Sequence, residues 1–335
     1  MKKLISLLVL VAMLAAAAFG CAAPQEPVAP APEAPAAATE APAAEPAKEG
    51  PYTFGYTCMT MNNPFFIALE ASIREEVEAR GDKLITVNPQ MDVALQISQI
   101  EDLIVQDIDA IFLNPVDWEG IRPALVALKD AGIPIFNFDA EVKDMEFVTA
   151  YAGSDNKNAG FVCGEDLVKR FPEGGKIAVL DSPTMNSVND RIAGFMEAIE
   201  GKGFEIVYQQ DAKGDLQTAL KLAEDMLQIA EADQIIAVMG GNDPTALGIC
   251  AALKAANRTD VIVYGVDGSP EAKKEISEGT LFAGSGAQSP ISIGKESAKL
   301  AYAYLAGEEV PARVPVQTFL INKDNVAQYG VDGWQ

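Results

Sequence analysis

Apolar runs of strand length end repeatedly at an asparagine or an aspartate along this chain. The six residues at these ends are Asn88, Asn114, Asp139, Asp181, Asn242 and Asp267. Segments with helical periodicity separate the runs, and buried strands that alternate with helices predict parallel sheets. Ligands of such sheets bind in the crevice outside the carboxyl ends of the strands. We therefore expect these short hydrogen-bonding side chains to converge on one crevice that binds a polyhydroxylated small molecule.

The first strand is expected at residues 53–60, and a helix follows it. Asn63 can cap this helix, Pro64 suits its first turn, and Gly81 ends it. Two more long helices are predicted at residues 156–170 and 291–305. Further strands are predicted at residues 83–88, 110–114, 133–139, 146–151, 176–181, 205–210, 234–239, 261–267, 281–285 and 314–321.

The chain has 335 residues, which is too many for one ordinary core and suits two lobes of about 130 to 150 residues each. Strands and helices alternate throughout, and no long linker separates two autonomous halves. The fold class that we predict is α/β, with two doubly wound parallel-sheet lobes and a cleft between them. The second lobe is expected to begin near Gly153.

The N-terminus has the pattern of an export signal. Lys2 and Lys3 precede an apolar run over residues 4–18, and Cys21 follows shortly after it. This run is shorter than the roughly 20 residues of a membrane-spanning helix. The pattern resembles a lipoprotein signal, in which residues 1–20 are removed and Cys21 is lipidated as the new N-terminus. The alternative is plain secretion with an incidental cysteine.

Residues 21–51 are rich in Ala, Pro and Glu. Frequent proline prevents a stable helix, and the low hydrophobicity leaves nothing to bury. We expect a polyproline-II-like tether with a reach of up to roughly 90 Å, at about 3.1 Å per residue. Together with a lipid anchor, it would place a globular head above a membrane. A simple disordered tail fits the composition equally well.

The composition argues against several classes of function. The formal net charge is −23 and the chain has no histidine; the clustered Lys and Arg that nucleic acid requires are not seen. No P-loop or nucleophile elbow occurs. Residues 284–286 lack the third glycine of a dinucleotide fingerprint, and residues 155–158 lack the ligand alternation of a calcium loop. We expect no enzyme, no metal and no cofactor, with carboxylate catalysis on a carbohydrate as a remote alternative.

Cys58, Cys163 and Cys250 remain once Cys21 is set aside. They are widely spaced and lie in apolar surroundings without a pair motif. We expect three small buried hydrophobic residues. One disulfide with a free thiol is the alternative.

Seven short motifs follow one another in a specific order. They are Asn62–Phe66, Asn114-Pro115, Asp139, Asp190–Phe195, Asn242-Asp243, Gly265–Pro270 and Gln288–Pro290. In this order they resemble the ribose-binding-type periplasmic sugar receptors, which are type I substrate-binding proteins of ABC transporters. The resemblance extends from about Tyr52 to the C-terminus.

The resemblance implies a set of ligand-binding residues. Those expected to hydrogen-bond the sugar are Asn63, Asn114, Asp139, Arg191, Asn242, Asp267 and Gln288, and those expected to pack on its ring are Phe65 and Phe66. It also implies that the chain crosses between the lobes three times, near residues 153, 288 and 316. The N-terminal lobe then comprises residues 52–153 and 289–316, and the C-terminal lobe comprises residues 154–288 and 317–335.

The charged residues of this set suit a sugar ligand. Asp139 and Asp267 can each accept hydrogen bonds from neighbouring hydroxyls, and Arg191 can donate as a planar fork. Each also has a structural alternative. The two aspartates can cap helices or shape turns, and Arg191 can pair with Asp190 or Asp181 on the surface.

The aromatic and amide residues are equally open to two interpretations. Phe65 or Phe66 can cover an apolar ring face, as lining side chains do in small-ligand pockets, or can belong to the core. Asn63 can contact the ligand or simply cap its helix.

Three departures from the ribose-type pattern concern the ligand. Ala140 follows Asp139 where ribose-type receptors have an arginine, Met59 replaces a small polar residue, and Gly214 lies where an aromatic residue normally closes the other ring face. We therefore expect a ligand with different hydroxyl geometry, greater bulk or an open polyol chain. Trp118 can supply an aromatic group at the cleft mouth, or an ordinary helix-start contact.

We expect an extracytoplasmic substrate-binding lipoprotein that captures a monosaccharide or polyol and delivers it to an ABC transporter permease. The lobes would close about the crossing strands, because a ligand that contacts both lobes favours the closed form. The expected partners are the permease and, through the lipid anchor, the membrane. We expect a monomer and no contact with nucleic acid. Signalling to a membrane sensor or chemoreceptor is the alternative output.

Overall fold

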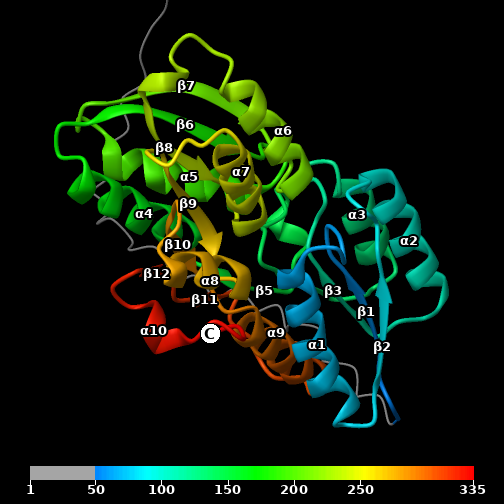
Figure 1. The fold of residues 1–335 in the computed structure, drawn as a ribbon. Coiled ribbons are helices and arrows are strands. Elements are labelled where there is room, and N and C mark those ends of the chain that lie inside the picture. The colour runs from blue at the N-terminus through cyan, green and yellow to red at the C-terminus, as the bar shows by residue number, and fades with distance from the viewer. Residues whose placement is uncertain (1–49) are drawn as a thin grey trace, which may run out of the picture. The chain divides into compact units, whose positions relative to one another are not determined.

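The computed structural model describes residues 50–335 (Figure 1). The predicted signal peptide, Cys21 and the tether up to residue 49 lie outside the described residues. Within residues 50–335, no helix has both the length and the apolar character that a membrane span requires.

The first sheet has its strands in the order β11-β5-β4-β3-β1-β2, and all neighbouring strands are parallel. Its strands are β1 (Thr53–Thr57), β2 (Lys83–Val87), β3 (Ala110–Leu113), β4 (Ile135–Phe138), β5 (Ala150–Ser154) and β11 (Arg313–Val316). The helices that accompany it are α1 (Pro64–Glu78), α2 (Val93–Val105), α3 (Arg122–Asp130) and α9 (Pro290–Leu305). Phe112 of β3 packs with Phe54 in one core, whereas its neighbour Ile111 packs with Leu103 in another. A strand buried on both faces explains why its sequence is continuously apolar.

The second sheet has its strands in the order β12-β10-β9-β8-β6-β7, and only the β10–β12 pair is antiparallel. Its strands are β6 (Gly175–Asp181), β7 (Phe204–Asp211), β8 (Ile235–Gly240), β9 (Ile262–Asp267), β10 (Phe282–Ala287) and β12 (Phe319–Asn322). Its helices are α4 (Asn156–Arg170), α5 (Asn186–Ile199), α6 (Leu216–Met226), α7 (Asp243–Ala255), α8 (Pro270–Glu278) and α10 (Val326–Tyr329). Two short 3₁₀ helices complete the described elements, η1 (Met145–Phe147) and η2 (Ala232–Gln234).

The predicted α/β class with two doubly wound, mainly parallel sheets is confirmed. The chain passes between the two sheets three times. It leaves the first sheet after β5, returns after β10 through α9, and leaves again between β11 and β12 (Figure 1).

The prediction of one strand over residues 314–321 is wrong. Strand β11 ends at Val316 in the first sheet, and β12 begins at Phe319 in the second. The hydroxyl of Thr318 between them donates to the carbonyl of Asp155 at 3.0 Å. This bond fixes the chain where it changes sheets, so a single apolar run supplies a strand to each.

The strand predicted at residues 146–151 also lies elsewhere. The 3₁₀ helix η1 occupies Met145–Phe147, and the strand runs over Ala150–Ser154. The alternating apolar residues of this segment fit a short helical turn as well as a strand, which explains the displaced prediction.

The three cysteines of the described residues are buried and free. Cys163 Sγ lies 3.5 Å from the carbonyl oxygen of Gly265, inside the second sheet's core. The prediction of three small buried hydrophobic residues is confirmed, and the disulfide alternative is wrong.

Helices α4 and α5 approach each other closely at two glycines. A Cβ on Gly160 would lie 1.7 Å from the carbonyl oxygen of Arg191, and a Cβ on Gly194 would lie 1.9 Å from that of Lys157. Only glycine permits this approach. The close contact of the two helices therefore fixes the backbone position from which the Arg191 side chain extends.

Candidate functional site

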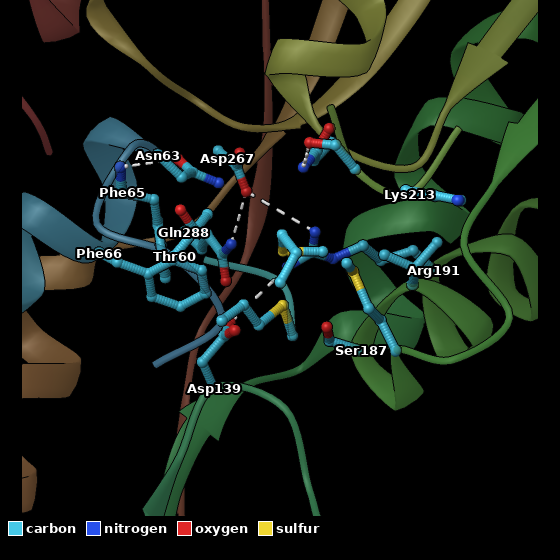
Figure 2. A pocket seen from close by; sticks show the side chains of 16 residues that line it. Thr60, Asn63, Phe65, Phe66, Asp139, Ser187, Arg191, Lys213, Asp267 and Gln288 are labelled. Atoms are coloured by element: carbon cyan, nitrogen blue, oxygen red, sulfur yellow. Dashed lines mark hydrogen bonds and ion pairs between the residues drawn. The ribbon is translucent and has the colours of Figure 1, made fainter. Parts of the chain in front are cut away.

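A cavity of about 40 Å³ lies between the carboxyl ends of strands from the two sheets (Figure 2). We call it the inner cavity. Its lining residues are Met59, Thr60, Asn63, Phe65, Phe66, Met91, Asp139, Met185, Ser187, Val188, Arg191, Lys213, Gly214, Asn242, Asp267 and Gln288. A buried water needs roughly 10–15 Å³, so the inner cavity has room for about three waters in this conformation.

Eight of the nine predicted ligand-binding residues line the inner cavity. The exception is Asn114, which lies directly behind Asp139. Its Nδ2 donates to Oδ2 of Asp139 at 3.1 Å and to the carbonyl of Phe138 at 3.1 Å. Asn114 is fully buried, so in this conformation it orients the Asp139 carboxylate rather than facing the cavity.

The expectation that all six strand-end residues converge is wrong for Asn88 and Asp181. Asn88 follows β2, which is the edge strand of the first sheet, and its Oδ1 accepts from the backbone N–H of Met61 at 3.1 Å. Asp181 accepts from Gln209 on the neighbouring edge strand β7. Asn88 follows an edge strand and Asp181 ends the strand beside one, and both stabilise neighbouring turns and strands instead of the site.

Arg191 is the central cation of the inner cavity, with a side chain only 4% exposed. Its Nε donates to Oδ1 of Asn156 at 2.8 Å, and its Nη1 donates to the carbonyl of Gly241 at 3.0 Å. Its Nη2 lies 3.8 Å from Oδ1 of Asp139, and its Nη1 lies 3.7 Å from Oδ1 of Asp267 (Figure 2). The surface-pair alternative is wrong, because the guanidinium is buried between two carboxylates.

Asp139 is held in an unusual environment at the end of β4. Its φ is +59°, in the left-handed region that non-glycine residues seldom adopt. Such conformations concentrate at ligand sites, where the surrounding structure maintains them. Burial raises the pKa of the Asp139 carboxyl to about 6, although Arg191 and the Asn114 amide oppose the shift. Oδ1 of Asp139 is a buried acceptor without a hydrogen-bond partner among the described residues.

Asp267 ends β9 and has a φ of +140°. Its Oδ1 accepts from Nε2 of Gln288 at 2.7 Å, and its Oδ2 accepts from the backbone N–H of Asp243 at 3.4 Å. Burial raises the pKa of the Asp267 carboxyl, the Arg191 charge opposes this, and the nearby Asp243 carboxylate adds to it. Ser269, not Asp267, caps helix α8, so the capping alternative for Asp267 is wrong.

Asn63 and Asn242 combine two roles. Oδ1 of Asn63 accepts from the N–H of Phe65 and caps α1, and Oδ1 of Asn242 accepts from the N–H of Thr245 and caps α7. Both residues also line the inner cavity. The capping interpretation of Asn63 is thus correct. Because Oδ1 makes the cap, the amide nitrogen Nδ2 stays available next to the cavity.

Phe65 and Phe66 provide one apolar wall. Both are buried in the core of the first sheet and also line the inner cavity, with their ring centroids 5.4 Å apart in an edge-to-face arrangement. Core packing and cavity lining are therefore not alternatives here. Packing in the core fixes the positions of the two rings, and the same rings form part of the cavity wall.

Methionines form much of the remaining apolar surface, and sequence analysis missed two of them, Met91 and Met185. The Met185 methyl carbon lies 3.5 Å from where a Cβ on Gly214 would stand. Met185 thus fills part of the space at the position where an aromatic residue was missing from the sequence. Trp118 does not line the inner cavity, and its backbone N–H donates to the carbonyl of Thr184 at 3.1 Å.

The other lining residues that sequence analysis missed are Thr60, Ser187, Val188 and Lys213. They lie in turns after strands or in the first turn of α5, where no periodic pattern of the sequence identifies a residue as part of a binding site. Among the described residues, no group of three or more acidic, cysteine or histidine side chains could hold a metal ion.

Comparison with known proteins decides the family. A model of the periplasmic binding protein domain matches residues 54–309. The chain belongs to this family. The predicted resemblance to ribose-binding-type receptors is confirmed by ribose import binding protein RbsB of Bacillus subtilis (strain 168), which is 33% identical over 271 residues. That match covers 80% of this chain and 87% of the relative.

Ribose import binding protein RbsB of Escherichia coli (strain K12) is 31% identical over 272 residues, or 81% of this chain and 90% of that protein. Two solved structures support the same type I fold. An ABC transporter solute-binding protein from Mycobacterium smegmatis with bound glycerol is 31% identical, with a TM-score of 0.80 over 85% of this chain and 99% of that one. One from Bacillus halodurans with bound myo-inositol is 29% identical, with a TM-score of 0.78 over 84% of this chain and 98% of that one.

Proposed function

We propose that this protein is the extracytoplasmic substrate-binding component of an ABC transporter and that it binds a monosaccharide or a related polyol in the inner cavity. The observation that carries this proposal is a set of buried acceptors around Arg191. Oδ1 of Asp139 and Oε1 of Gln288, on two residues that line the inner cavity, are buried without a hydrogen-bond partner among the described residues. A buried acceptor left without a partner costs about 1–3 kcal/mol. Hydroxyl groups of a ligand would supply the missing donors.

The relatives support this class of ligand. Two of them are ribose import binding proteins, and two solved structures hold glycerol and myo-inositol. All three bound or imported compounds carry adjacent hydroxyls. The departures at Met59, Ala140 and Gly214 favour a polyol or a sugar other than ribose.

The mechanism that we propose is hinge closure. The moving units are the N-terminal lobe (residues 52–153 and 289–316) and the C-terminal lobe (residues 154–288 and 317–335). The inner cavity of about 40 Å³ is smaller than the roughly 300–1,000 Å³ of typical small-molecule pockets. A ligand would therefore enter an open form, and closure would bring Arg191 of one lobe towards Asp139 of the other.

Delivery completes the proposal. Cys21 would carry the lipid anchor, residues 21–51 would form the tether, and the closed monomer would present the ligand to a membrane permease. The relatives that match this chain are transport proteins. We propose no nucleic-acid partner, because the formal net charge of −23 would repel the phosphate backbone.

The test is a thermal-shift screen against pentoses, hexoses, inositols and sugar alcohols, followed by calorimetry. A ligand that binds only the folded state raises the melting temperature. We expect at least one of these compounds to do so, and Arg191→Met to abolish the effect. Absence of any shift across the panel would overturn the proposal. Chemical conversion of a bound sugar would replace it with the enzyme alternative.

A further inference from the structure

A second and larger space adjoins the inner cavity. This outer cavity has a volume of about 540 Å³, within the range of pockets that hold small molecules. The two cavities share Thr60, Asn63, Met91, Lys213, Gly214 and Asp267 in their walls. A ligand held in the inner cavity would therefore have an opening into the outer one.

The outer cavity remains although the two sides of the cleft already touch elsewhere. Nη2 of Arg191 lies 3.8 Å from Oδ1 of Asp139 across the inner cavity, and the backbone N–H of Trp118 donates to the carbonyl of Thr184 at 3.1 Å. The outer cavity is thus not the consequence of two lobes held apart along their whole length.

Trp334 gives the outer cavity an aromatic wall. Its ring centroid lies 5.8 Å from that of Phe65, with the ring planes at 78°. Phe65 lines the inner cavity, so one aromatic pair extends from the inner cavity to the outer one. Aromatic faces suit the C–H faces of sugar rings, because both surfaces are apolar and flat.

The C-terminal tail that carries Trp334 is anchored on the binding residues themselves. Nε2 of Gln335 donates to the carbonyl of Asp267 at 2.9 Å and also to that of Gln288. The fully buried Lys273 donates to the carbonyl of Gly333. These bonds fix the chain on both sides of Trp334, and the contact with Phe65 orients its ring, as a binding platform requires.

The rest of the outer wall is rich in hydrogen-bonding groups. It includes the amides of Asn62 and Gln90, the hydroxyl of Thr218, and the carboxylates of Asp215 and Glu271. The Thr218 hydroxyl already donates to Oδ1 of Asp215 at 2.8 Å, whereas Asn62, Gln90 and Glu271 are exposed residues of the wall. A sugar ring would match them with hydroxyls while its C–H face covers the indole.

We propose that the outer cavity binds a second sugar ring, which makes the natural ligand a disaccharide, and that Trp334 is the residue on which this ring stacks. This inference rests on the proposed function, because the first ring would occupy the inner site around Arg191.

The test compares disaccharides with the methyl glycosides of their terminal sugars by calorimetry. The pairs are cellobiose with methyl β-glucoside, maltose with methyl α-glucoside, and xylobiose with methyl β-xyloside. We expect at least one disaccharide to bind about tenfold or more tightly than its methyl glycoside, which corresponds to about 1.4 kcal/mol. Trp334→Ala should bring that ratio close to one, and Trp334→Phe should retain part of it.

Trp118→Phe is the matched control, because Trp118 lines neither cavity. It should leave the ratio unchanged, and it also makes Trp334 the only tryptophan of the chain. In this variant, the disaccharide should shift the fluorescence of Trp334 and the methyl glycoside should not.

Two outcomes would overturn the inference. Equal affinities within every pair would show that the outer cavity adds nothing. A Trp334→Ala variant that keeps its fold and its full disaccharide ratio would remove Trp334 from the site. If neither sugars nor polyols bind at all, the proposed function itself fails, and this result is distinct from the other two.

Discussion

Nη2 of Arg191 lies 3.8 Å from Oδ1 of Asp139, and this ion pair connects helix α5 of the second sheet with the end of β4 in the first. The pair is buried on both sides, yet no direct hydrogen bond joins it. The strong bonds of the guanidinium go to Asn156 and Gly241 instead. This arrangement leaves space between cation and carboxylate that a ligand hydroxyl can bridge.

Asp139→Asn should weaken ligand binding without lowering the stability of the ligand-free protein. The substitution removes a charged acceptor, so ligand affinity should fall at least about tenfold. Because burial already disfavours the ionised carboxylate, the melting temperature of the ligand-free protein at pH 7.5 should stay equal or rise. Calorimetry and thermal denaturation measure the two effects.

The control for this variant is Asp130→Asn at the exposed end of α3, which should change neither quantity. Unchanged affinity together with a lower melting temperature would mean that Asp139 has only a structural role.

Asp267→Ala should weaken ligand binding by at least about tenfold, because it removes a charged hydrogen-bond acceptor and frees Gln288 from its partner. Asp181→Ala, at the end of β6 in the same sheet, should leave the affinity unchanged because Asp181 lines neither cavity. Equal calorimetric affinities for wild type and Asp267→Ala would remove Asp267 from the site.

The stability of the ligand-free protein should fall as the pH rises from about 4 through 6. The folded-state pKa of Asp139 is about 6 and its unfolded value is 3.8, so the folded protein binds more protons than the unfolded chain in this interval. The raised pKa of Asp267 acts in the same direction. The difference between wild type and Asp139→Asn, measured by chemical denaturation at each pH, should isolate the contribution of Asp139.

Ligand affinity should have the opposite slope and increase over the same interval. Hydroxyls that donate to the Asp139 carboxylate favour its ionised form, so binding near pH 6 should release protons. The binding enthalpy should then depend on the ionisation enthalpy of the buffer. An affinity that is flat from pH 4.5 to 7 would contradict this coupling.

Gly160→Ala should destabilise the protein and weaken binding together. The new methyl group would overlap the Arg191 carbonyl oxygen, at 1.7 Å, and α5 would have to move away from α4. Overpacking of this kind costs about 1–3 kcal/mol. Denaturant unfolding should detect the loss, whereas Glu165→Ala on the exposed face of α4 should leave stability and affinity nearly unchanged.

The three thiols should be unreactive in the native protein. Burial raises the pKa of Cys58 and of Cys250 to about 12 in each case, and the pKa of Cys163 is also raised. In a chain that begins after Cys21, a thiol reagent should label no cysteine under native conditions and three after unfolding. One reactive thiol after unfolding would instead indicate a disulfide.

The strand-end pattern predicted the site best at the centre of each sheet. It placed Asp139, Asn242 and Asp267 at one crevice, because neighbouring parallel strands end at the same edge. It was wrong for Asn88 and Asp181, since the order of strands across a sheet is not encoded in the order along the chain. The pattern of apolar residues reports burial, and it does not report which strand lies at the margin of a sheet, as β2 does, or beside it, as β6 does.

The sequence by itself determined the alternation of strands and helices, the α/β class and the caps of the main helices, because these depend on neighbours a few residues away. Tertiary structure alone decided that residues 314–321 supply one strand to each sheet, that Met185 lies beside Gly214, and that Trp334 packs on Phe65. Each of these contacts joins segments far apart in the chain, and no local preference specifies the partner. They arise only when two packed sheets bring their turns and the C-terminal tail to the same cleft.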